Sequence, residues 1–237
     1  MTQFKKTLAT AGVCAALFVS AQANAATSAI MTVKGNIVPA ACSINLSNNG
    51  EVSFGSIAAS TIRNAPAGNT LAQLGTKDMT VTISCEASAA MGFKVTDNRA
   101  SSKVDLSTTT FADPAFPGDY ATDNPSFGFG LGLASNSAKI GAYGIALKAS
   151  EATADGKSVD MAISDDNGKT WRTSALVHPL STGQRVISVA NPGGAAPKLF
   201  TEAVLPMKIN AAVQTSSVLG SDEIVLDGNA TVSLVYL

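Results

Sequence analysis

The last residues of the chain alternate between apolar and polar side chains, and this pattern constrains the fold more than any other feature. Val232, Leu234 and Tyr236 fall on one face of an extended segment, with polar residues between them. A period of two indicates a half-buried β-strand, and Asp227-Gly228 is a turn signal just before it. Because chain ends usually fray unless something pairs with them, a strand that ends at Leu237 is well shaped for binding by another protein along its edge.

The first residues have the pattern of an export signal. Lys5 and Lys6 precede an apolar core from Leu8 to Val19, and Ala23-Asn24-Ala25 is a small-residue cleavage site. This arrangement predicts a secretory signal peptide over residues 1–25, with a core too short for a stable membrane anchor. Residues 26–34 then form an N-terminal extension, and residues 35–237 form one domain.

Charge and composition exclude nucleic acid as a partner. Removal of residues 1–25 lowers Lys plus Arg from 16 to 14 against 17 Asp plus Glu, which leaves a net charge of −3. That balance provides no electrostatic footprint for nucleic acid. The chain is rich in Ala, Ser, Thr, Gly and Val and only 14% charged, which favours an all-β extracellular protein.

Two cysteines, Cys42 and Cys85, remain after export. In a secreted chain they predict one disulfide, which would stabilise the fold by roughly 4 kcal/mol for a loop of roughly forty residues. Two distant thiols and a single histidine, His178, do not make a zinc site. We therefore expect no metal and no cofactor.

Several internal segments have strand patterns. Lys77 to Cys85 alternates between apolar and polar residues, and Phe127 to Leu133 is a glycine-rich strand. Further strands are expected at Ile140–Leu147, Ser158–Ser164 and Leu199–Val213. Residues 101–127 are rich in Ser, Thr, Asp and Pro, which predicts a long loop or a poorly ordered insertion. No helix is expected beyond the signal peptide.

The order of these features resembles subunits of chaperone–usher fimbriae. The resemblance rests on a strand from Gly35 to Cys42-Ser43, a Val52-Ser53-Phe54-Gly55 step, a strand ending at Cys85, and a terminal strand with tyrosine next to last. It covers about half of the exported chain. The sequence is most similar to a branch of uncharacterised fimbrial-like proteins that have a Thr-Asp-Asn-Arg-Ala segment after the second strand, here residues 96–100.

The resemblance implies an immunoglobulin-like, pilin-type β-sandwich with long loop insertions, in which Cys42 and Cys85 link two strands. It implies a structural subunit that is exported to the periplasm and assembled into a surface fimbria by donor-strand exchange. The implied partners are a periplasmic pilus chaperone, an outer-membrane usher and neighbouring fimbrial subunits. The implied donor face is Ala29, Met31, Val33 and Gly35, and the implied chaperone-contact strand carries Val232, Leu234, Tyr236 and Leu237.

One motif points elsewhere. Ser164, Asp166, Gly168, Thr170 and Trp171 match the Asp-box, which sialidases repeat around a propeller. A single copy predicts a structural β-hairpin, with Asp166 capping the turn and Trp171 as a buried anchor. A sialidase also needs an arginine cluster, and the exported chain has few arginines. His178 precedes a proline in a loop-like segment and is expected to be solvated.

Two other classes of function stay open. The chain could be a self-complete, adhesin-like module that binds a host glycan or surface receptor through loops at 101–126 and 186–198. It could also be a glycosidase, although it lacks a nucleophile elbow and an opposed pair of carboxylates. We expect a protein that is not an enzyme.

Overall fold

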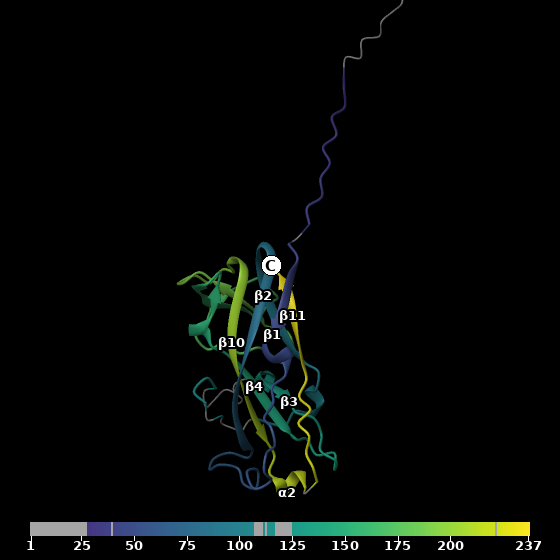
Figure 1. The fold of residues 1–237 in the computed structure, drawn as a ribbon, viewed down its shortest axis with the longest axis vertical. Helices are drawn as coiled ribbons and strands as arrows, with labels where there is room; N and C mark the ends of the chain where they lie inside the picture. The colour runs from purple at the N-terminus through teal and green to yellow at the C-terminus, as the bar shows by residue number, and fades with distance from the viewer. Residues whose placement is uncertain (1–27, 39, 107–110, 112, 117–124, 221) are drawn as a thin grey trace, which may run out of the picture. The chain divides into compact units, whose positions relative to one another are not determined.

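A computed structural model describes residues 28–38, 40–106, 111, 113–116, 125–220 and 222–237 (Figure 1). The chain divides into two compact units, residues 1–38 and 39–237. The predicted signal peptide lies outside the described residues. Residues 28–38 form neither helix nor strand, and Met31 and Val33 are 87% and 85% exposed. This division falls after Val38, and residues 35–38 form no strand.

The second unit consists almost entirely of strands. They are β1 (Cys42–Leu46), β2 (Ala72–Asp97), β3 (Gly128–Gly130), β4 (Gly141–Leu147), β5 (Thr153–Ala154), β6 (Lys157–Ser158), β7 (Asp160–Ser164), β8 (Arg172–Thr173), β9 (Val186–Ala190), β10 (Leu199–Val213) and β11 (Ala230–Tyr236). The described helices are short: the 3-10 turns η1 (Ser47–Gly50), η2 (Ala100–Ser102), η3 (Pro125–Phe127) and η4 (Ala149–Glu151), and α2 (Ser216–Leu219).

The long strand β2 organises this unit because it pairs in two places. Its first part pairs with β10 along one edge and with β1 along the other, and its last part pairs with β11 and β9. Beyond β10 lie β4 and β3, and beyond β9 lie β7 and β8. All of these pairings are antiparallel. The predicted all-β class is thus confirmed as a curled antiparallel sheet.

The alternation expected in the sequence produces the core. Met79, Val81 and Ile83 are buried on one face of β2, and the polar residues between them are not. The strand is longer than predicted, because Phe93 and Val95 resume the same period after Cys85 and are buried too. Conversely, the strand expected at 127–133 is only three residues long in β3, since Gly132 adopts a positive φ of 93°.

The insertion at 101–127 was predicted to be a long loop or a poorly ordered segment. Its described residues form no strand, as in a loop, but Val104, Leu106, Phe111 and Phe116 are buried in a second apolar cluster. The cluster packs on alanines of β4 and β10, which are Ala142, Ala146 and Ala212. The residues between these alanines, such as Tyr143 and Ile145, face the main core. Both faces of β4 are therefore covered.

Candidate functional site

Two of the strands that flank β2 keep one edge without a partner strand. Among the described strands, β1 and β11 each pair only with β2. They come together at one end, where the Cys42 N–H donates to the Tyr236 hydroxyl at 3.3 Å. Figure 1 shows that this end, marked by the C-terminus, lies opposite α2. Unpaired edges expose rows of backbone donors and acceptors that another strand can bind.

A groove of about 880 Å³ opens between the segment that follows β1 and the segment that leads into β11. Its floor is formed by side chains of the main core, among them Met79, Val95, Tyr143, Ile145, Met207 and Ile209. The floor residues are buried and belong to β2, β4 and β10. No described strand therefore lies over this part of the core.

Both walls of the groove present apolar side chains at a period of two. Leu46, Val52 and Phe54 form one wall, and Ile224, Leu226, Gly228, Ala230 and Val232 form the other. The intervening residues on each wall are mostly exposed. Neither residues 51–57 nor residues 222–229 belong to a strand, although their side chains alternate as in one. A β-strand with apolar side chains on one face fits such a slot.

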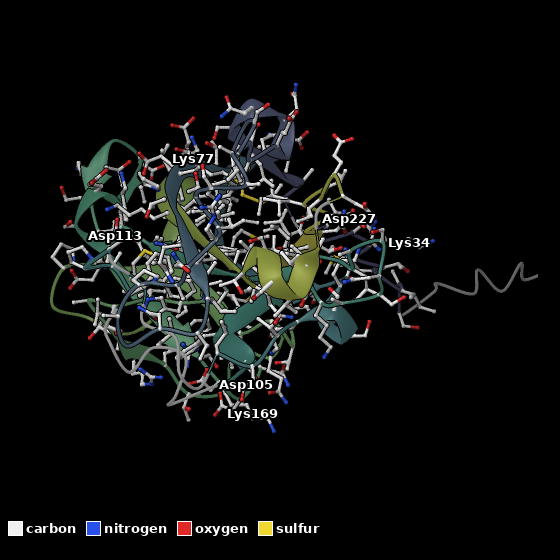
Figure 2. All side chains as sticks on the ribbon, turned by 90° about the horizontal axis from the view of Figure 1, so that it is seen from below. Lys34, Lys77, Asp105, Asp113, Lys169 and Asp227 are labelled. Carbon is white, nitrogen blue, oxygen red and sulfur yellow. A yellow bond between two sulfur atoms is a disulfide. The ribbon has the colours of Figure 1, made fainter. Side chains whose placement is uncertain are left out.

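The Thr96–Ala100 motif holds the second wall in place. Asn98 N–H donates to the Asn229 carbonyl at 3.0 Å, and its side-chain amide donates to the Thr231 hydroxyl at 2.9 Å. The Arg99 guanidinium forms a 2.8 Å ion pair with Asp227, which Figure 2 labels in a view from the α2 end. Asp227 N–H in turn donates to the Leu131 carbonyl at 2.9 Å.

A buried carboxylate links this motif to the glycine-rich strand. Asp97 is 8% exposed and accepts hydrogen bonds from the Gly130 N–H at 2.9 Å and the Arg99 N–H at 2.8 Å. A Cβ at Gly130 would lie 2.2 Å from the Arg99 carbonyl oxygen and 2.6 Å from Ser102 Oγ. Glycine is thus required at position 130 because the motif turns directly against β3.

Known proteins are similar in sequence along nearly the whole chain. A family model described as "Protein of unknown function (DUF1120)" matches residues 31–144. Protein GltF of Escherichia coli (strain K12) is 35% identical over 259 aligned positions, which cover 99% of each chain. The chain belongs to the DUF1120 family. Uncharacterized protein YhcF of the same organism is 28% identical over 238 positions, covering 93% of this chain and 95% of its own.

The part matched by the DUF1120 model contains much of the groove. It includes β1, the 51–57 wall, β2, the Thr96–Ala100 motif, β3 and most of β4. The names of the two relatives state no partner and no assembly, so the resemblance to fimbrial subunits stays a prediction.

The predicted site residues are distributed as follows. The Cys42–Cys85 disulfide is present with an S–S distance of 2.10 Å and joins β1 to β2, which indicates an oxidising, exported compartment. Val232 and Leu234 pack on the main core from β11, whereas Tyr236 and Leu237 are 54% and 44% exposed. The proposed donor residues lie in the exposed 28–38 segment.

The Asp-box is a hairpin between β7 and β8. The Asp166 carboxylate accepts hydrogen bonds from the Ser164 hydroxyl at 2.7 Å and from the Thr170 N–H at 2.9 Å. These donors, with the Thr170 hydroxyl first among them, lower the pKa of Asp166 well below its usual value. Gly168 supplies a positive φ of 87°. Trp171 is only partly buried, which corrects the expected buried anchor, because the indole N–H stays at the turn and donates to the Gly168 carbonyl at 3.0 Å.

His178 is buried, contrary to the expectation of a solvated residue. Its Nε2 lies 2.8 Å from the Ala115 carbonyl oxygen, and its ring packs against Phe116 and Phe127. Burial lowers the pKa of the His178 imidazole below its usual value. No periodic pattern in the sequence indicates this contact, because the partner residue Ala115 lies in the insertion.

Sequence reasoning also missed the second wall of the groove. Its signal was available, since Ile224 and Leu226 continue the alternation of β11 toward the N-terminus. The Asp227-Gly228 turn signal hid this continuity. In the described part of the chain no three potential metal ligands cluster. None of its helices is long and apolar enough to cross a membrane.

Proposed function

We propose that this chain is a structural subunit of a surface fimbria, assembled by donor-strand exchange through a periplasmic chaperone and an outer-membrane usher. In this proposal the second unit is a pilin-type, immunoglobulin-like sandwich that lacks one strand. The groove of about 880 Å³ is the observation that carries the proposal. It combines a floor of core residues with two strand edges that lack partners among the described strands, and β-strand addition needs such an edge beside an apolar slot.

The N-terminal segment has the properties of the missing strand. Ala29, Met31 and Val33 share one face of an extended segment, with Gly35 next in step. Their exposure is costly for a free monomer, because burying one large apolar side chain stabilises a protein by about 1.5–3 kcal/mol. In the proposal these residues enter the groove of a neighbouring subunit, where the alternate wall residues fix the register.

The C-terminal strand supports a preceding chaperone step. Val232 lines the groove, and the Tyr236 and Leu237 side chains remain about half exposed beyond it. A chaperone strand laid in the groove would contact Val232 and pair with the free edge of β11. The Leu237 carboxylate would then meet a basic residue of the chaperone.

A self-complementing fusion tests this function. We would append residues 26–38 to the C-terminus through a flexible linker and compare its Tm with that of the exported chain. A strand that fills the groove should raise Tm by about 5 °C or more, since the fused strand binds only the folded state. The matched control is the same fusion with Met31→Asp and Val33→Asp in the appended copy. Strand exchange would be rejected if the exported chain, the fusion and the control fusion had equal Tm values and the exported chain were a stable monomer.

A further inference from the structure

The rim of the groove carries an uneven set of charges. Three acidic residues and no basic residue are among those that line it, namely Glu51, Asp222 and Glu223. None of the three forms an ion pair within the described part of the chain, whereas the nearby Asp227 is neutralised by Arg99. The groove therefore presents negative potential to any strand that enters it.

The acids stand at different ends of the groove. Asp222 and Glu223 begin the second wall near α2, and the Asp222 carboxylate is held by a 2.8 Å hydrogen bond from Ser135. Glu51 begins the other wall, just after β1 and η1. Because β1 and β11 meet at the end far from α2, Glu51 lies nearer to that end than the Asp222–Glu223 pair does.

The 26–38 segment carries the complementary charge. Lys34 is its single charged side chain. It follows Val33 and precedes Gly35, so it falls on the face opposite to Met31 and Val33. When the apolar face of this strand enters a groove, Lys34 must point outward to the rim.

We infer that Lys34 of one copy pairs with the Asp222–Glu223 acids of the copy that receives its strand, and that this contact selects both partner and register. The inference rests on the proposed function and names a second copy of this chain as the occupant. Lys34 lies near the C-terminal end of the donor strand. Pairing with Asp222–Glu223 therefore places that end of the donor beside α2, whereas pairing with Glu51 would place it toward the opposite end. Exposed charge pairs contribute little to affinity but strongly affect association rates.

The test measures the association rate of a fluorescent peptide of residues 26–38 with the exported chain by stopped flow. At low salt, Lys34→Glu in the peptide should slow association about threefold to tenfold, and the difference should shrink in 0.5 M NaCl as charges are screened. Glu223→Lys in the chain should restore the rate of the Lys34→Glu peptide. Glu51→Lys is the matched rim control and should not restore it, and Glu202→Lys, on an exposed site of β10, should change neither rate.

The outcomes separate the two proposals. Wild-type binding with no effect of Lys34→Glu would overturn the charge contact and leave strand exchange intact. Restoration by Glu51→Lys instead of Glu223→Lys would also overturn it, because the strand would then lie the other way. Absence of any wild-type binding at every salt concentration would reject the proposed function, and this inference with it.

Discussion

At the scale of single residues, Asp165 of the Asp-box forms ion pairs with two arginines. Its carboxylate accepts from Arg185 Nε at 2.6 Å and from Arg172 at 3.0 Å. Arg185 is buried, and it also donates to the His178 carbonyl at 2.8 Å. These contacts connect the Asp-box hairpin to the loop before β9. The motif therefore has a structural role that needs no catalytic chemistry.

We predict that Asp165→Asn destabilises the protein in a pH-dependent way. Hydrogen bonds from Arg185, the largest cause, hold the pKa of Asp165 below its usual value near 4. Its stabilising effect is therefore present above that value and is lost as pH falls through the folded-state pKa. At pH 7 the loss should be about 1–2 kcal/mol, less than for a fully buried pair because the Asp165 side chain is 42% exposed.

Urea unfolding at pH 7 and at pH 3 measures this effect. Asp78→Asn, which breaks an exposed ion pair with Lys148, is the matched control and should cost less than about 0.5 kcal/mol. A loss for Asp165→Asn that is equally large at both pH values would contradict the charge-based account.

At the scale of elements, the walls of the groove depend on a contact between the Thr96–Ala100 turn and β3. The backbone of Arg99 and the side chain of Ser102 occupy the space beside Gly130, and Asp97 binds its N–H. We predict that Gly130→Ala lowers the free energy of unfolding by about 1–3 kcal/mol, the usual cost of forcing an extra methyl group into a packed site. Gly35→Ala, where no atom lies within 4 Å of the added Cβ, should leave it unchanged in the same denaturation experiment. Equal stability of the two variants would mean that the turn can move freely.

Local patterns in the sequence predicted part of this arrangement. The alternation of residues 77–85, 199–213 and 230–236 was enough to place β2, β10 and β11, because one face of each is buried. The roles of Asp97 and His178 could not be predicted, since each depends on a partner far away in the chain. Residues 51–57 and 222–229 alternate between apolar and polar side chains but form no β-strand. Their role as walls of the groove could therefore be recognised only in the three-dimensional structure.

At the scale of the whole molecule, the two ends of the exported chain have matching patterns in different environments. Val232 and Leu234 pack on the core, whereas Met31 and Val33 are exposed. Within the described residues, an amphipathic segment lies exposed and a groove contains no strand. In the proposed function, exchange between copies would satisfy both features, and it would need no cofactor because binding completes a fold.

The last prediction separates the two ends by their effects on assembly. Met31→Asp should leave the second unit folded with an unchanged Tm, because this side chain is 87% exposed, yet it should abolish incorporation into fibres by placing a charge in the neighbour's groove. Leu234→Asp should instead lower the periplasmic yield several-fold, since it puts a charge against the core of its own subunit. Thr32→Asp, on the opposite face of the same strand, is the matched control for Met31→Asp. Fibres that form equally well from the Met31→Asp and Thr32→Asp chains would show that the N-terminal segment is not the donor.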